Sequence, residues 1–149
     1  MATLESKLGS KLTKAPAILP THKLLSISPN AEDHDALRRI VTDLNWHLFS
    51  AETLYDALNR LISDRFALIL CEDVLEDGTW KDLLHQPGEP PIVVTSHLAD
   101  EHLWCEVLNL GGYDVLAKPF SNREVVHLLR TITLRMPVEG TRVRTAGAI

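Results

Sequence analysis

The feature that most constrains the fold is a nearly continuous apolar run at residues 66–71, FALILC, followed directly by the acidic stretch EDVLED. Six residues are enough for a strand but too few for a typical helix. A strand without polar alternation is typical of one covered on both faces, and such strands occur mainly in parallel sheets. The run therefore predicts a central parallel strand that ends in acidic residues.

Short apolar runs and helical patterns alternate on both sides of this strand. We expect strands at residues 22–28, 46–50, 66–71, 91–95 and 113–117. The segments that follow them carry apolar residues at helical spacing, and they predict five helices, of which the third, after the acidic stretch, is short. The same spacing predicts that Ile62, Leu108 and Leu110 face the core. Five strands alternating with five helices predict an α/β fold, an open parallel sheet with helices on both faces.

The composition fits one domain with an extension at each end. The chain has 149 residues, of which 45% are hydrophobic, enough to bury a single core. We expect the domain at residues 22–134, a flexible arm at 1–21 and a flexible tail at 135–149, because proline and glycine interrupt the periodicity at both ends. The alternative for the arm is a short basic amphipathic helix that touches a partner or a membrane.

Several classes of function are disfavoured by charge and hydropathy. The net charge of −5 provides no uniform positive field for nucleic acid. No run approaches the roughly 20 apolar residues that a membrane span needs. Cys71 and Cys105 have neither disulfide-framework nor metal-site spacing. We therefore expect a cytoplasmic protein without nucleic-acid or membrane partners.

Three segments together resemble the receiver domain of two-component response regulators. They are LILCEDVLEDG at 68–78, VVTS at 93–96 and LNLGGYDVLAKPF at 108–120, and the resemblance extends over residues 22–134. It implies a flavodoxin-like (βα)5 three-layer sandwich with a parallel sheet of order 2-1-3-4-5. It also implies a cis bond between Lys118 and Pro119.

The resemblance also implies a phosphorylation site, and this chain departs from it. A receiver uses a strand-end aspartate as phosphoacceptor, a Mg²⁺ held by an acidic pair, a hydroxyl residue and a lysine. The motifs place Thr95 and Lys118 at the last two positions, as remnants of a phosphate site. Glu72 stands at the phosphoacceptor position, and Ser28 and Pro29 stand where the acidic pair belongs. Because Ser28 and Pro29 are poor ligands for Mg²⁺, we expect no metal and no other cofactor.

Two interpretations of the acidic stretch remain open. Glu72 can mimic a phosphorylated aspartate permanently by pairing with Lys118. A shift of one residue would instead make Asp73 the phosphoacceptor, and Mg²⁺ would then be required. Glu76 and Asp77 are expected in a solvated loop.

The acids Glu32, Asp33 and Asp35 fall at the start of the first predicted helix. Negative charges at a helix N-terminus complement the helix dipole, and this is the role we expect for them. The alternative is that one of the three approaches the site.

These observations predict a stand-alone, receiver-like signal-transduction module that is not an enzyme and acts through protein–protein contacts. The alternative is an active phosphorelay receiver, phosphorylated at Asp73 or Glu72 in the presence of Mg²⁺, and a third class is a small-ligand-binding α/β domain. The expected partner is a histidine kinase or a downstream effector, with homodimerisation as a further option. In the receiver family the fourth helix, fifth strand and fifth helix form the usual partner face, where the candidates here are Trp104, Tyr113, Val126, His127 and Arg130.

Overall fold

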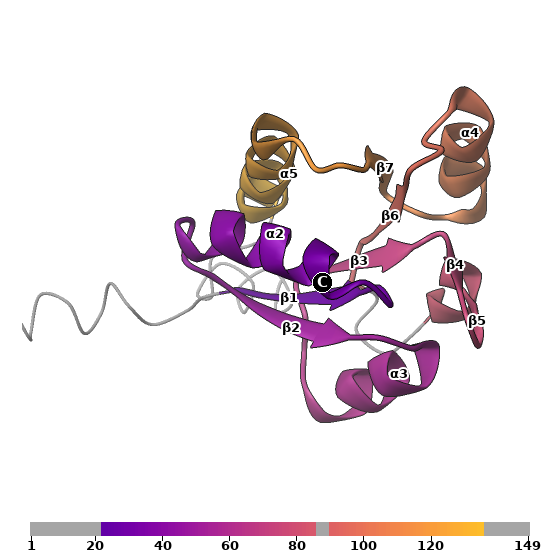
Figure 1. The fold of residues 1–149 in the computed structure, drawn as a ribbon, viewed down its shortest axis with the longest axis horizontal. Coiled ribbons are helices and arrows are strands. Elements are labelled where there is room, and N and C mark those ends of the chain that lie inside the picture. The colour runs from indigo at the N-terminus through magenta and orange to yellow at the C-terminus, as the bar shows by residue number, and fades with distance from the viewer. Residues whose placement is uncertain (1–21, 86–89, 136–149) are drawn as a thin grey trace, which may run out of the picture.

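The computed structural model describes residues 22–85 and 90–135, and a five-stranded parallel sheet forms the centre of this part of the chain (Figure 1). Its strands are β1 (His22–Ile27), β2 (Trp46–Ala51), β3 (Leu68–Glu72), β6 (Ile92–Ser96) and β7 (Asp114–Ala117). Their order is β2-β1-β3-β6-β7, and every adjacent pair is parallel. The predicted order 2-1-3-4-5 is therefore confirmed.

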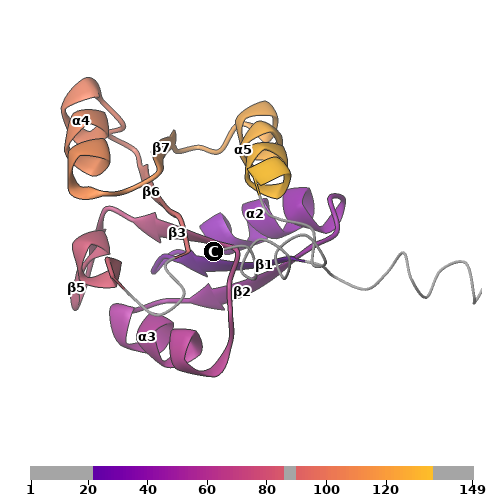
Figure 2. The same cartoon turned by 180° about the vertical axis from the view of Figure 1, so that it is seen from behind.

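Helices cover both faces of this sheet (Figures 1 and 2). The helices α2 (Ala31–Thr42) and α5 (Asn122–Arg135) contribute to the hydrophobic core on one face. The helices α3 (Leu54–Ser63) and α4 (Glu101–Leu110), with the short 3-10 helix η1 (Trp80–Leu83), contribute to the core on the other face. The result is the three-layer sandwich expected from the sequence.

The position of β3 between two layers of helices explains why its first four residues, 68–71, are all apolar. Leu68 and Leu70 belong to the core cluster beneath α2 and α5, whereas Ile69 and Cys71 belong to the cluster beneath α3 and α4. Successive side chains of a strand point to opposite faces, so a strand that is covered on both faces needs apolar residues at every position.

The third helix is short, as predicted, and it is preceded by a hairpin. The strands β4 (Val74–Leu75) and β5 (Gly78–Thr79) pair antiparallel directly after β3. The four-residue η1 follows, with a capping box in which the Thr79 side chain accepts from the backbone of the first turn while Asp82 accepts from the Thr79 N–H. Gly78 has a φ of 158°, and a Cβ there would lie 2.6 Å from Leu54 Cδ2. The hairpin therefore needs glycine at this position.

The prediction that Ile62, Leu108 and Leu110 face the core is wrong. The Ile62 side chain is 84% exposed, and both leucines are also exposed. Each helix packs against a single face of the sheet, so only a narrow stripe is buried. In α3 this stripe runs from Leu54 to Leu61, and Ile62, one position further on, is rotated out of it.

The two chain ends lie largely outside the described residues. This applies to the whole predicted arm at 1–21 and to the predicted tail except Arg135, which is the last residue of α5. Within the described ranges, no helix has the length and apolar character needed to cross a membrane.

Candidate functional site

The residues predicted for the site gather where the parallel strands end. Glu72, the last residue of β3, pairs in register with Thr95 of β6. Ser28 follows β1, and Lys118 follows β7, where its N–H donates to the Ser96 carbonyl at 3.0 Å. Thr95, Ser28 and Lys118 are buried, and Glu72 is partly buried. The carboxyl edge of the sheet thus brings together residues from four separate segments, as expected for this class of fold.

Lys118 is the centre of the site. Its side chain is only 1% exposed, and its Nζ donates to Glu72 Oε1 and, at 2.8 Å, to Asp33 Oδ2. Burial opposes the charged form of the lysine, but the hydrogen bonds to Asp33 and Glu72 outweigh this effect and raise the pKa of Lys118. The Lys118–Pro119 bond is cis, as the resemblance implied.

Asp33 is a site residue that the sequence did not single out. It is one of three acids at the start of α2 that we expected to complement the helix dipole, with approach to the site as the alternative. Its Oδ2 accepts from Ser28 Oγ at 2.7 Å as well as from Lys118. Burial alone would raise the pKa of Asp33, but the hydrogen bonds from Lys118 and Ser28 lower it overall. The available signal was its spacing of five residues from Ser28, which matches no recognised motif.

Ser28 links the first strand to this ion pair. Its hydroxyl donates to Asp33 and accepts from the N–H of Asn30 at 3.1 Å. It is therefore part of the turn that leads into α2.

The buried His34 holds the same turn from the other side. Its Nε2 lies 2.9 Å from the carbonyl oxygen of Ser28, and its Nδ1 lies 2.9 Å from Ser26 Oγ. A carbonyl oxygen only accepts, so Nε2 donates to it, and in the neutral ring Nδ1 accepts from the Ser26 hydroxyl. His34 shares the buried face of α2 with Leu37 and Val41, and no role was predicted for it from the sequence.

Asp73 is next to the site but has a different environment. Its N–H donates to the Thr95 carbonyl at 3.0 Å, whereas the Lys118 ammonium donates to Glu72 and Asp33. Burial, together with the charges of Glu106 and Glu72, raises the pKa of Asp73. The pKa of Asp73 is therefore shifted in the opposite direction from that of Asp33.

Asp77 is exposed in the turn between β4 and β5, as expected for a loop acid, but it also makes two hydrogen bonds to the backbone of α3. Its Oδ1 accepts from the N–H of Leu54 at 2.8 Å, and its Oδ2 accepts from the N–H of Tyr55 at 2.9 Å. These backbone hydrogen bonds lower the pKa of Asp77. Asp77 thus caps α3 from 23 residues away in sequence. Glu76 is also exposed in this turn, as predicted.

Comparison with known proteins agrees with this fold. The chain has a TM-score of 0.72 and 23% identity to a two-component response regulator from Clostridium difficile, covering 79% of this chain and 100% of that one. It has a TM-score of 0.69 and 20% identity to the Francisella response regulator 1452 receiver domain, covering 77% and 98%. For the chemotaxis response regulator CheY4 of Vibrio cholerae the TM-score is 0.67 at 17% identity, covering 74% and 98%. The chain has the receiver fold of response regulators.

Sequence comparison adds one relative. The chain is 31% identical over 104 residues, 67% of its length, to a probable transcriptional regulatory protein, y4xI, of Sinorhizobium fredii. The match covers 46% of that protein, so the chain spans about half the length of the curated relative. No protein-family profile matches the chain.

The donors at this receiver-fold site do not fit a Mg²⁺ ion. Magnesium prefers carboxylate and water oxygens in octahedral geometry. The two carboxylates that converge, Asp33 and Glu72, share the ammonium of Lys118, while Ser28 donates to Asp33 and Pro29 offers no side-chain ligand. Across residues 22–85 and 90–135, no group of three or more His, Cys, Asp or Glu side chains is arranged to hold a metal.

The five residues predicted for the partner face lie in different environments. Trp104 is exposed on α4, and its Nε1 donates to Asp114 of β7 at 3.3 Å. Tyr113 and His127 line a hollow between β7 and α5. Val126 is half-buried on α5. Arg130 lines a different groove, formed by α5 and the turn between α2 and β2.

Proposed function

We propose that the chain is a receiver-like signal-transduction module with a degenerate phosphorylation site, in which Glu72 permanently takes the role of a phosphorylated aspartate. The observation that supports this most directly is the ion pair of Lys118 with Glu72 at the carboxyl edge of the sheet. Glutamate is one methylene longer than aspartate, which carries its negative charge further from the strand end and toward the lysine.

The strength of the pair is sufficient for a regulatory role. A hydrogen bond to a charged group contributes about 1.5–3 kcal/mol. An equilibrium between two surface conformations of a receiver shifts about tenfold for each 1.4 kcal/mol of differential stabilisation. A permanent Glu72–Lys118 pair therefore holds the module in one conformation without a phosphorylation cycle.

Signal output on this proposal occurs through protein–protein contacts at the exposed surface of α4, β7 and α5. The partner class is a signalling protein, either a histidine kinase or a downstream effector. The name of the S. fredii relative, a probable transcriptional regulatory protein, supports a place in transcriptional control, which is a proposal because the chain spans only 46% of that protein.

Incubation with a small phosphodonor and Mg²⁺, followed by intact-mass measurement, tests the proposal. We expect no phosphoryl adduct on the wild-type chain and no increase in thermal midpoint with beryllofluoride and Mg²⁺. Ligand binding at saturation raises the midpoint, so a true receiver site would show a shift of several degrees. An adduct that disappears in Asp73→Asn would contradict the proposal and establish the active-receiver alternative.

A variant that rebuilds the ordinary site provides the matched positive control. In Ser28→Asp/Pro29→Asp/Glu72→Asp the acidic pair and the aspartate are both present, and we expect a beryllofluoride response that wild type lacks. If wild type and this variant respond equally, the degenerate positions are not what determines phosphorylation, and the proposal fails.

A further inference from the structure

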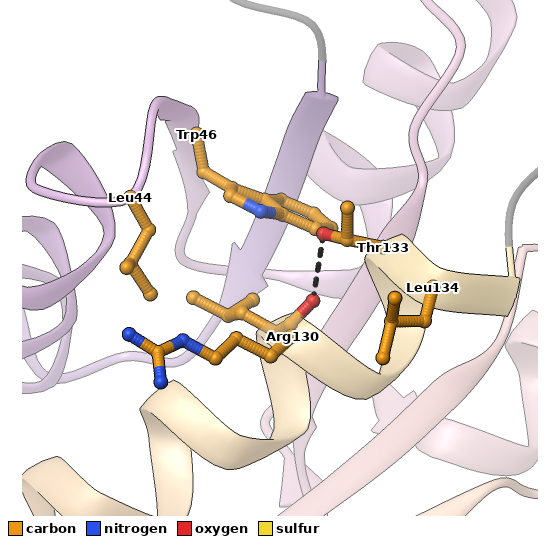
Figure 3. A pocket seen from close by; sticks show the side chains of 6 residues that line it. Leu44, Trp46, Arg130, Thr133 and Leu134 are labelled. Atoms are coloured by element: carbon orange, nitrogen blue, oxygen red, sulfur yellow. Dashed lines mark hydrogen bonds between the residues drawn. The ribbon is translucent and has the colours of Figure 1, made fainter. Parts of the chain in front are cut away.

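An apolar groove lies at the amino-terminal edge of the sheet, opposite the edge that carries Lys118. Its volume is about 290 Å³, and it is lined by Leu44, Trp46, Leu129, Arg130, Thr133 and Leu134. Figure 3 shows the Trp46 indole along one side of the groove, with Leu44 and Leu134 at its two ends. Thr133 Oγ1 donates to the Leu129 carbonyl at 2.8 Å, so this hydroxyl is already used within α5.

The chain enters the fold directly beside this groove. His22, the first residue of β1, is in register with Trp46, the first residue of β2. Their rings lie 5.0 Å apart between centroids. The segment that precedes His22 therefore joins the fold next to the Trp46 side of the groove.

The residues that precede His22 have the chemistry of an occupant. Residues 16–20 read PAILP, without charge, and Ile18 and Leu19 stand four and three positions before His22. At up to about 3.6 Å per residue, both side chains can reach the groove from the start of β1. The flanking prolines restrict the unfolded chain and so reduce the entropy lost on docking.

We propose that residues 16–20 bind in this groove, with Ile18 and Leu19 packed against Trp46 and Leu134. Leu134 is 85% exposed in the described part of the chain, and it gains the most from being covered.

Two other occupants fit less well. Residues 136–149 follow α5 immediately and would have to reverse direction at once to cover its last turns, and they would bring Arg142 and Arg144 toward Arg130. A second copy of the chain needs an interface of about 20–30 residues on each side, much larger than a groove of six residues.

Nuclear Overhauser contacts in the full chain test the proposal. We expect contacts from the methyl groups of Ile18 or Leu19 to the Trp46 indole, unchanged by dilution. Contacts from Met136 or Val138 instead, or contacts that vanish on dilution, would assign the groove to the tail or to a second copy and overturn the proposal.

Thermal midpoints provide an independent readout with matched variants. Ile18→Asp/Leu19→Asp is expected to lower the midpoint by about 5 °C, whereas Leu4→Asp/Leu8→Asp, the same change earlier in the chain, leaves it unchanged. Leu134→Ser is also expected to lower the thermal midpoint. Its control is Ile62→Ser on α3, which removes an apolar side chain of the same size and similar exposure and is expected to leave the midpoint unchanged. Combining Leu134→Ser with the Ile18/Leu19 change is expected to add little. Equal effects of each variant and its control would overturn the proposal.

Discussion

At the scale of single residues, the site is defined by a buried lysine shared between two carboxylates. Glu72 comes from a strand end and Asp33 from a helix 39 positions earlier in sequence, so Lys118 ties together β3, α2 and the segment after β7. Removing one partner of a buried pair costs more than the pair contributes, because a charge is left incompletely compensated. When Glu72 is replaced, Asp33 still pairs with Lys118 and limits this cost.

The substitution Glu72→Gln tests the contribution of the strand-end acid. It keeps the shape but removes the charge that faces Lys118, and we expect the free energy of unfolding in urea to fall by about 1–3 kcal/mol. Glu76→Gln, on an exposed residue in the turn between β4 and β5, is the control and is expected to stay within about 0.5 kcal/mol of wild type. Equal stabilities of Glu72→Gln and wild type would show that Glu72 is an indifferent loop acid.

At the scale of elements, regular patterns were predictable and tertiary adjustments were not. The strands were predictable from the apolar runs. The Glu72–Lys118 contact was predictable from the order of the motifs, because the carboxyl ends of parallel strands lie at one edge of the sheet. Asp33 reaches Lys118 from the first turn of α2, and residue spacing alone did not show which of the three acids there would do so. The hairpin β4–β5 was also missed, because two-residue strands have no periodicity to read.

That hairpin sets the start of α3 through Asp77, and Asp77→Ala tests this link. The change leaves the Leu54 and Tyr55 amides without their carboxylate acceptor, so we expect a lower thermal midpoint and faster hydrogen exchange in the first turn of α3. Glu76→Ala, one residue earlier and exposed, is expected to change neither. If exchange in α3 is the same in both variants, the Thr53 side chain, which accepts from the N–H of Asp56, is sufficient to cap the helix.

At the scale of the whole molecule, the charged edge affects how stability depends on pH. The pKa of Asp33 lies below its ordinary value of 3.8, so its contribution is complete above that value and is lost as the pH falls through the folded-state pKa. The pKa of Lys118 lies above 10.5, so its contribution is lost only as the pH rises through the folded-state pKa. Asp73 has the opposite sign from Asp33, because its raised pKa means that protonation relieves an unfavourable charge.

Urea unfolding of wild type, Asp33→Asn and Asp73→Asn across acidic and neutral pH separates these effects. Asp33→Asn is expected to be less stable than wild type at neutral pH. The difference is expected to narrow as the pH falls below 3.8, where Asp33 is protonated first in the unfolded chain, and to vanish once the pH is below the folded-state pKa. Asp73→Asn is expected to be more stable than wild type at neutral pH, with its advantage shrinking as the pH falls, because wild-type Asp73 then loses its charge too. If the free energies of unfolding of Asp33→Asn and wild type changed in parallel with pH, Asp33 would titrate alike in the folded and unfolded chains. The Asp33–Lys118 ion pair would then contribute nothing to the dependence of stability on acidic pH.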